Sequence, residues 1–201
     1  MKRLLIGTLC GLAFVTASGV SAQSASVGSA APAFSAKDLA GGPVTLADFK
    51  GKYVVIEWTN PDCPYVRKHY NSGNMPATQK RAATKGAVWL SVSTGETHSA
   101  TELQSWQRAK NASPTATLTD TDGRIARAYG AKTTPHMYIV DPQGTLIYAG
   151  AIDSKPSSNP ADIESATNYV DQALGEAMSG KRVSRSVTQA YGCSVKYPSG
   201  A

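Results

Sequence analysis

The apolar and polar positions of the chain alternate in a way that predicts strands separated by helices. Two runs, YVVIEWT (53–59) and AVWLSVS (87–93), are rich in β-branched and aromatic residues and are apolar on both faces. This composition is typical of buried central strands. TATLTD (115–120) predicts a shorter strand, and residues 63–85 favour helix with a break at 71–74. The first half of the chain therefore predicts strands joined by helical crossovers.

A second group of signals predicts how the sheet closes. HMYIVD (136–141) and TLIYAGAID (145–153) are strand-like and are separated only by Pro-Gln-Gly. So short a link predicts an antiparallel hairpin. Ser99 followed by Glu102 forms a capping box, which predicts the start of a helix. IARAYG (125–130) predicts a short helix that ends in glycine.

The last long helix is expected to start at Asn159-Pro160 and to end at Gly180. Asparagine suits the cap of a helix, proline its first position and glycine its end. The order of elements, β-α-β-α-β-α-β-β-α, predicts an α/β fold with a central mixed sheet flanked by helices. Apolar residues recur at helical spacing along this last helix at Ile163, Ala166, Val170, Ala173, Leu174, Ala177 and Met178.

The first residues have the composition of a secretory signal peptide. Lys2 and Arg3 precede an uncharged, mostly apolar run over residues 4–15, and the small residues at 20–22 fit a cleavage site. The apolar run is too short for a spanning helix, although an uncleaved anchor remains the alternative. We therefore expect an exported chain, periplasmic or secreted, that loses residues 1–22.

The remaining chain predicts one domain over residues 23–180 and a C-terminal tail over residues 181–201. Residues 23–33 are small and polar and predict a flexible lead-in segment. The net charge of the full chain is +6, and it falls to +4 without the two basic residues of the signal peptide. Because this excess is mild and no basic run has interleaved aromatics, we expect no nucleic-acid partner. We also expect no membrane association after cleavage.

Two of the three cysteines remain after cleavage. Cys10 lies in the signal peptide, which leaves Cys63 and Cys193 with 129 residues between them. Export would place both in an oxidising compartment, where disulfides persist. The spacing allows either a long-range pair or two separate thiols.

Cys63 lies where a helix is expected to begin. Pro64 lacks an N–H and suits the first helical turn, so Cys63 is predicted to cap the helix. There a side chain faces free N–H groups and the positive end of the helix dipole. Both favour a thiolate, as do Arg67 and Lys68 one turn on, whereas Asp62 opposes it. We therefore expect a lowered pKa for Cys63, and a buried inert thiol is the alternative.

A second motif, TTPH (133–136), precedes the first strand of the predicted hairpin. Three blocks of sequence, GSAAPAFSAKDLAGGPVTLADFKGKYVVIEW, CPYV and TTPHMYIVDPQGTLIYAG, resemble the thioredoxin-fold superfamily. The likeness is to its redoxin and peroxiredoxin-like (AhpC/TSA-type) branch. It runs from about Gly28 to Asp153, and the closing helix extends it over most of the chain. The resemblance implies a thioredoxin-like (redoxin) domain.

The resemblance also implies roles for several residues. Pro135 would be a cis proline that packs beside Cys63, and Thr134 would offer backbone groups to an extended bound segment. Trp58, Thr134 and Pro135 would together shape the substrate groove.

The chain departs from two patterns of this superfamily. Thioredoxins use C-x-x-C, but Asn60 and Val66 stand three residues before and after Cys63. No cysteine at that spacing can resolve a mixed disulfide. Peroxiredoxins place proline seven residues and threonine or serine three residues before their cysteine. Ile56 and Asn60 stand there instead, with Thr59 one residue away, so the peroxidase reading has the weaker support.

Two charged residues near Cys63 are candidates for supporting roles. Glu57 lies six residues before Cys63, at a spacing where thioredoxins carry a buried acid. Burial would raise its pKa and suit it to general-base work; alternatively, Glu57 faces a lysine or a solvated edge. Arg67 is a candidate for holding an anion such as a peroxide, and Arg124 or Arg127 are others.

The tail contains AYGCSVKY (190–197), which is unusually aromatic for a free end. We expect it to dock over the start of the helix, so that Cys193 resolves a mixed disulfide formed at Cys63. The first alternative is a permanent Cys63–Cys193 staple, which would stabilise the fold by roughly 4–5 kcal/mol. The second is a pair of unpaired thiols.

These observations predict an exported thiol-disulfide oxidoreductase with Cys63 as nucleophile and Cys193 as resolving partner. The alternatives are a peroxiredoxin-like thiol peroxidase with an antioxidant role, and a non-enzymatic binding domain stapled by a disulfide. The expected partners are protein thiols and disulfides, or small peroxides. No cofactor is expected, because the cysteine pair is the redox group. No metal is expected either, and Cys63, Cys193 and His136 are the only candidate ligand set.

Overall fold

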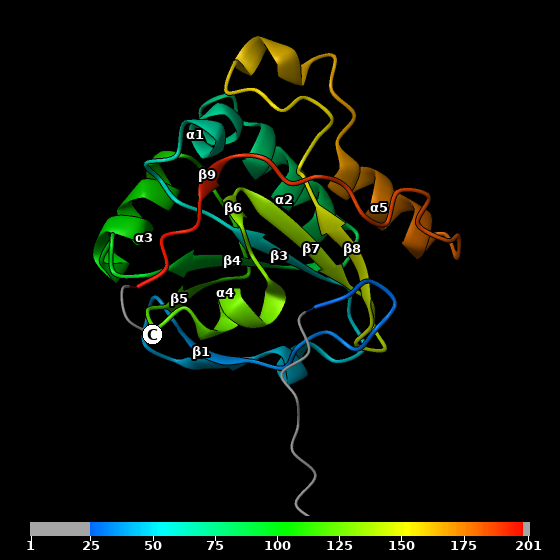
Figure 1. The fold of residues 1–201 in the computed structure, drawn as a ribbon, viewed down its shortest axis with the longest axis horizontal. Helices are drawn as coiled ribbons and strands as arrows, with labels where there is room; N and C mark the ends of the chain where they lie inside the picture. The colour runs from blue at the N-terminus through cyan, green and yellow to red at the C-terminus, as the bar shows by residue number, and fades with distance from the viewer. Residues whose placement is uncertain (1–24, 199–201) are drawn as a thin grey trace, which may run out of the picture.

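The computed structural model describes residues 25–198, and its centre is a seven-stranded sheet (Figure 1). The strands are β1 (Ser35–Asp38), β2 (Pro43–Thr45), β3 (Val54–Trp58), β4 (Val88–Thr94), β5 (Ala116–Asp120), β7 (His136–Val140) and β8 (Leu146–Gly150). Their order in the sheet is β2-β1-β5-β4-β3-β7-β8. Strands β3, β4 and β5 are parallel, and β7 and β8 are antiparallel. The predicted mixed sheet and its closing hairpin are therefore confirmed.

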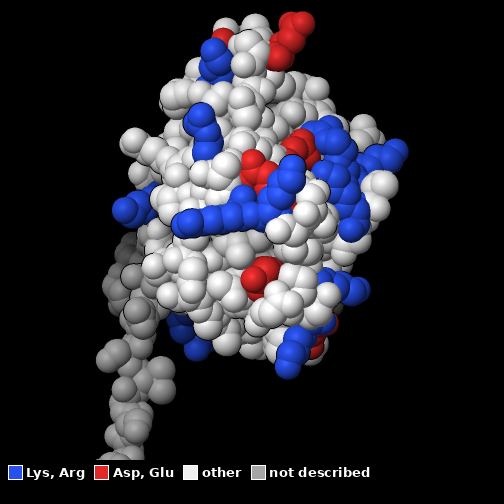
Figure 2. Space-filling view, turned by 90° about the vertical axis from the view of Figure 1, so that its right-hand side faces the viewer, with Lys and Arg blue, Asp and Glu red and all other residues white. Residues whose placement is uncertain are grey.

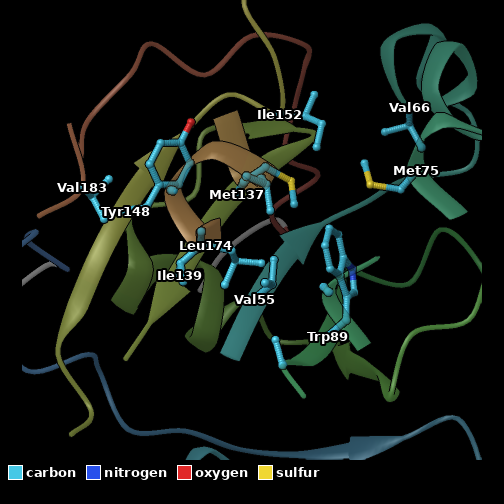
Figure 3. Close-up of a cluster of buried hydrophobic side chains, with 14 of the residues drawn as sticks. Val55, Val66, Met75, Trp89, Met137, Ile139, Tyr148, Ile152, Leu174 and Val183 are labelled. Atoms are coloured by element: carbon cyan, nitrogen blue, oxygen red, sulfur yellow. The ribbon is translucent and has the colours of Figure 1, made fainter. Parts of the chain in front are cut away.

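Helices cover both faces of this sheet (Figure 1). They are α1 (Pro64–Asn71), α2 (Asn74–Thr84), α3 (Ala100–Ala109), α4 (Arg124–Tyr129) and α5 (Tyr169–Met178). One core cluster joins the sheet to α1, α2 and α5, and Figure 3 shows Val55, Trp89 and Met137 of the sheet together with Val66 and Leu174 of the helices. A second cluster joins the opposite face to α4. Because both faces are covered, all five residues of β3 are buried.

The edge formed by β1 and β2 was not expected from the sequence. Both strands are short and only partly buried, so they lack the apolar alternation that indicates a strand. The Asp38 carboxylate holds the turn between them by accepting hydrogen bonds from the N–H groups of Ala40 and Gly42 at 2.9 and 2.8 Å. A short 3-10 helix, η1 (Leu46–Phe49), then leads to β3.

The expectation of a flexible lead-in segment is wrong for residues 25–33. Ala25 N–H donates to the Ala128 carbonyl at 3.0 Å, and Gly28 N–H donates to the Leu146 carbonyl at 2.8 Å. The backbone of this segment is therefore bound to the body, although its side chains are small. The predicted signal peptide, residues 1–22, lies outside the described residues.

The last helix starts later than the sequence predicts. Asn159 does act as a cap, but only for a short 3-10 helix, η2 (Pro160–Ile163). Helix α5 begins at Tyr169, with Asn168 as its cap. Tyr169 N–H donates to the Ile152 carbonyl at 3.0 Å, so the chain is held against the end of β8 before the helix can begin. This long-range contact overrides the local helical spacing of Ile163 and Ala166.

The tail, beginning at residue 181, returns across the molecule and is red in Figure 1. It passes β8, where Thr188 N–H donates to the Ala149 carbonyl at 3.1 Å. It then forms β9 (Cys193–Ser194), which pairs antiparallel with β6 (Thr133–Thr134). In this ladder Cys193 lies opposite Thr134. The predicted docking of the tail is therefore present in the structure.

Two glycines allow the tail to lie this close to the body. Gly150 of β8 and Gly192 of the tail have φ values of +154° and +142°. A Cβ at Gly150 would overlap Thr188, and a Cβ at Gly192 would overlap the carbonyl oxygen of Thr134. Any other residue at either position would therefore push the tail away.

One group of charged side chains lies at the end of α5. Figure 2 shows Lys and Arg side chains gathered on the face that carries the end of α5 and the start of the tail. The exposed tail residues Lys181, Arg182 and Arg185 belong to this end of the molecule. Within residues 25–198, no helix has both the length and the apolar character needed to cross a membrane.

Candidate active site

The turn after β3 places Cys63 at the start of α1. The Asn60 side chain accepts a hydrogen bond from Asp62 N–H at 2.8 Å, and the Asn60 carbonyl accepts one from Cys63 N–H at 3.0 Å. Cys63 then occupies the cap position with Pro64 in the first turn. The predicted cap position of Cys63 is therefore confirmed.

Three segments meet at the Cys63 thiol. Cys63 is 2% exposed, and its Sγ donates to the Thr134 carbonyl oxygen at 2.9 Å. The peptide bond between Thr134 and Pro135 is cis, as the resemblance implies. Cys193, opposite Thr134 in the β6–β9 ladder, packs against the same core cluster as Cys63. Both cysteines are free thiols. The structure thus brings together four of the predicted site residues: Cys63, Thr134, Pro135 and Cys193.

The two thiols differ in acidity. Burial opposes ionisation of Cys63, but donors close to its sulfur, among them the Cys193 thiol and Val66 N–H, outweigh it, so the pKa of Cys63 is lowered. Burial, followed by the hydrogen bond with Cys63, raises the pKa of Cys193 to about 11, against a smaller opposing effect of Lys196. Cys63 therefore ionises first, and the Cys193 thiol donates to the thiolate that forms.

The two cations expected to favour the thiolate are bound elsewhere. The Arg67 guanidinium donates to Asp62 Oδ1 at 2.9 Å and to the Pro61 carbonyl at 2.8 Å. Lys68 Nζ lies in the interior, 3.5 Å from Asp153 Oδ2. The largest contributions that lower the pKa of Cys63 are hydrogen bonds rather than these charges. The direction of the predicted pKa shift and the expected contribution of a free N–H group, that of Val66, are confirmed, whereas the contribution expected from Arg67 and Lys68 is not.

Glu57 is a fully buried acid on β3, with 0% exposure. Its carboxylate accepts from the Tyr70 hydroxyl at 2.9 Å, from Trp89 Nε1 at 2.9 Å, from the Ser91 hydroxyl at 3.2 Å and from Gln79 Nε2 at 3.4 Å. Burial raises the pKa of Glu57 despite these four donors. The predicted buried acid with a raised pKa is therefore present, and the lysine contact and solvated edge of the alternative are not.

Trp58 lies in the core and has no exposed surface. Its indole N–H donates to Thr94 Oγ1 at 3.1 Å, and its ring packs against Tyr129 and Tyr138. These contacts belong to the core cluster on the α4 face of the sheet. The structure therefore gives Trp58 a packing role beneath the site and places none of it at a surface groove.

A buried polar cluster that the sequence analysis did not find lies between α1 and the tail. Lys68 and Asp153 form an ion pair at 3.5 Å, with side chains that are 0% and 2% exposed. The Tyr191 hydroxyl donates to Asp153 Oδ1 and lies 3.2 Å from His69 Nε2. Burial lowers the pKa of His69 to about 4, against the opposing charge of Asp153. Helical spacing gave no signal for Lys68, because it lies two residues from both Val66 and Tyr70 and therefore on the opposite side of α1, although all three are buried.

The candidate metal ligands are not assembled into a site. Among the described residues there is no group of three His, Cys, Asp or Glu side chains that could hold a metal ion. His136 Nδ1 instead accepts from Lys132 N–H at 3.2 Å, and burial lowers the pKa of His136 to about 4.

Known proteins resemble this chain in sequence and in fold. The AhpC/TSA family model matches residues 27–149. The thiol-disulfide oxidoreductase ResA of Bacillus subtilis (strain 168) is 26% identical over 146 residues, which cover 72% of this chain and 79% of that protein.

Solved structures extend the comparison. An uncharacterized conserved protein from Geobacillus kaustophilus superimposes with a TM-score of 0.74 at 23% identity, covering 88% of this chain and 94% of the other. The thioredoxin domain of a thiol-disulfide oxidoreductase from Bacteroides vulgatus gives a TM-score of 0.54 at 25% identity, covering 71% and 98%. The fold is therefore that of thioredoxin, as the sequence resemblance implies.

Proposed function

Because the chain belongs to the AhpC/TSA family, we propose that it is an exported thiol-disulfide oxidoreductase with Cys63 as nucleophile and Cys193 as resolving thiol. One observation carries this proposal above the others. The Cys63 thiol donates to the carbonyl of Thr134, which is the residue opposite Cys193 in the β6–β9 ladder, and the two thiols differ in acidity, with the pKa of Cys63 lowered and that of Cys193 raised to about 11. The name of the Bacillus relative supports the same class of reaction.

The reaction proceeds in two exchange steps. In the first, the Cys63 thiolate attacks one sulfur of a substrate disulfide; a Cys63–substrate bond forms, and the other substrate sulfur leaves as a thiolate. In the second, Cys193 loses its proton and attacks Cys63 Sγ; the Cys63–Cys193 bond forms, and the second substrate thiolate is released. The substrate disulfide is thereby reduced to two thiols and the cysteine pair is oxidised. The same steps in reverse oxidise a dithiol.

The raised pKa of Cys193 suits this order of events. Part of the increase comes from the neighbouring Cys63 sulfur. When Cys63 enters a mixed disulfide, its negative charge disappears, and that part of the increase disappears with it. Cys193 therefore becomes easier to ionise only after the first step, when it is needed as a nucleophile.

Supporting roles are proposed for the charged neighbours. Glu57 is the proposed proton acceptor, because it is buried and has a raised pKa. Tyr70, which donates to it at 2.9 Å, links it to α1. Arg67 is the weaker candidate for holding an anion, because its guanidinium is already bound by Asp62 and by the Pro61 carbonyl.

The proposed substrates are protein thiols and disulfides in an extracytoplasmic compartment. An extended substrate segment would bind at Thr134 and Pro135, along the backbone edge of β6 that β9 occupies in the structure, so it would bind while the tail is displaced. Export is supported by the composition of residues 1–22, which resembles a signal peptide.

The test is a trapping experiment with Cys193→Ser. This variant should form a stable mixed disulfide at Cys63 with a peptide disulfide, whereas Cys63→Ser should form none and should lose at least about a thousandfold in turnover, because the nucleophile is absent. Intact-mass measurement under acid quench identifies the adduct.

Two other outcomes would replace the proposal. Rapid consumption of hydrogen peroxide, with a sulfenic acid at Cys63 in Cys193→Ser and no peptide adduct, would indicate a peroxidase. A wild-type Cys63–Cys193 bond with a reduction potential below about −300 mV would indicate a structural staple.

A further inference from the structure

The buried pair Lys68–Asp153 has no part in the exchange reaction described above, yet it touches the tail two residues before the resolving cysteine. Lys68 Nζ also donates to the Lys155 carbonyl at 3.0 Å, and Lys155 N–H donates to Asp153 Oδ1 at 2.9 Å. Charges are rarely buried unless they are paired and hydrogen-bonded. Here the two charges are paired and each side chain makes hydrogen bonds within the body of the protein, although Asp153 Oδ2 has the ion pair with Lys68 and no hydrogen bond. The pair is therefore a fixed polar anchor.

Tyr191 is the tail residue that reaches this anchor. Its hydroxyl donates to Asp153 Oδ1, and Lys68 Nζ lies 5.6 Å from the centroid of its ring. The tyrosine ring also makes a T-shaped contact with Tyr65 of α1, at 5.9 Å between ring centroids. A hydrogen bond to a buried carboxylate is charge-assisted and stronger than one between neutral groups. The neighbouring tail contacts with Ala149 and Lys132 are, by contrast, ordinary backbone hydrogen bonds.

The docked tail also covers the nucleophile. Cys63 is 2% exposed, and Gly192 lies so close to the Thr134 carbonyl that even a Cβ would overlap it. A substrate sulfur therefore cannot bond to Cys63 beneath the docked tail. The tail must lift for the first exchange step and return for the second.

We propose that Tyr191 is a positioning residue whose hydroxyl latches the tail to the buried Lys68–Asp153 pair and so governs both access to Cys63 and resolution by Cys193. The inference rests on the proposed function. It predicts that weakening the latch affects the two exchange steps, addition to Cys63 and resolution by Cys193, in opposite directions. A looser tail exposes Cys63 more often, so the first step is faster. It also returns to the adduct less often, so the second step is slower.

The test variant is Tyr191→Phe, which removes the hydroxyl and keeps the ring. Asp153 retains Lys68 and Lys155 N–H, so no buried charge is left unpaired. Oxidised glutathione is the probe, and acid-quenched samples of the full chain are followed by intact mass. In a Cys193→Ser background the rate of glutathione addition to Cys63 should rise about tenfold. With Cys193 present, the rate of glutathione release should fall about tenfold, as expected for the loss of one charge-assisted hydrogen bond.

Tyr169→Phe is the matched control. The Tyr169 hydroxyl also contacts the tail, accepting from Arg185 Nη1 at 3.4 Å, but the arginine is exposed and lies at the start of the tail. We expect both rates to stay within twofold of the parent in this variant. The two variants can differ in thermal stability. Both glutathione rates are therefore measured well below the lower of the two melting temperatures, so that unfolding does not contribute to either rate.

Two results would overturn the latch: unchanged rates in Tyr191→Phe, or a change of both rates in the same direction. Failure of the proposed function is a separate outcome. If the parent chain holds its glutathione adduct as long as Cys193→Ser does, Cys193 is not a resolving thiol. The addition rate in the Cys193→Ser background still decides whether Tyr191 restrains the tail over Cys63.

Discussion

The start of α1 and the tail place two thiols side by side by different physical means. Cys63 follows β3, whose five residues are all buried, and precedes a helix whose Val66 and Tyr70 lie in the core. Cys193 belongs to a two-residue strand paired with β6 alone. Val183 and Val195 are the buried apolar residues of the described tail. One thiol is thus held by a rigid scaffold and the other by a segment that can open locally.

This difference suits the separate tasks that we propose for the two thiols. A nucleophile benefits from a fixed environment that lowers its pKa, and the environment of Cys63 is built from backbone and core residues. A resolving thiol must leave to admit a substrate and then return, and a segment with few apolar contacts can do so at modest free-energy cost. The predictions below test this difference between the fixed Cys63 and the mobile Cys193, from the largest expected effect to the smallest.

The largest effect is expected from Gly192→Ala. The added Cβ would overlap the Thr134 carbonyl in a backbone conformation that favours glycine, so the tail should no longer dock. We expect glutathione release to slow by about a hundredfold, the order expected when a steric clash of several kcal/mol opposes docking. Acid-quenched mass measurement gives the rate.

Gly180→Ala supplies the control for backbone strain alone. Gly180 has a φ of +71°, but a Cβ there would meet nothing within 4 Å. It should therefore lower thermal stability slightly and leave glutathione release unchanged. Equal slowing in both variants would contradict the role assigned to the close approach at Gly192.

A smaller effect is expected on the pH dependence of Cys63 alkylation by iodoacetamide. The rate should rise with pH and level off above the pKa of Cys63, at a lower pH than for an ordinary cysteine. Cys193→Ala removes a hydrogen-bond donor that lowers this pKa, so the midpoint should move to higher pH. At pH 7 a smaller fraction of Cys63 is then thiolate in Cys193→Ala. The rate of Cys63 alkylation, corrected for the greater accessibility of Cys63 in the variant, should fall by up to about tenfold.

Cys193→Ser is the comparison for that experiment because its hydroxyl keeps a donor. Its midpoint should lie between those of the parent and Cys193→Ala. If all three midpoints coincide, the tail thiol does not stabilise the Cys63 thiolate.

The smallest effect is expected from Trp58→Phe. The indole lies in the core and donates to Thr94 Oγ1, so its loss should cost about 1–2 kcal/mol in the free energy of unfolding. Urea denaturation measures this change. We expect the KM for a peptide disulfide to stay constant, and a clear rise in KM would restore Trp58 to the substrate groove.

Local sequence signals predicted the arrangement of the candidate site well. The positions of Cys63 and Thr134 are each set by the proline that follows them. They could therefore be predicted from short segments of sequence. The aromatic residues around Cys193 correctly indicated a tail that docks. Each of these features depends on few residues and on one strong constraint, such as a missing N–H or an apolar side chain that must be buried.

The features that were missed depend on contacts between distant segments. Nothing near Lys68 indicates that Asp153 and Tyr191 will meet it, because the pairing follows from the path of the chain after β8. The late start of α5 has the same origin, since Tyr169 is held by the Ile152 carbonyl. Lead-in residues such as Ala25 are held by backbone hydrogen bonds. Because the prediction of flexibility used only side-chain composition, it could not detect these bonds.

The depth of the Lys68–Asp153 pair has a consequence for the surroundings in which the protein works. Mobile ions screen exposed charge pairs such as Arg67–Asp62, whose side chains are 52% and 68% exposed, and screening weakens such pairs steeply between dilute and concentrated electrolyte. A pair with side-chain exposures of 0% and 2% is out of reach of those ions. The resting arrangement of the tail should therefore be nearly independent of ionic strength.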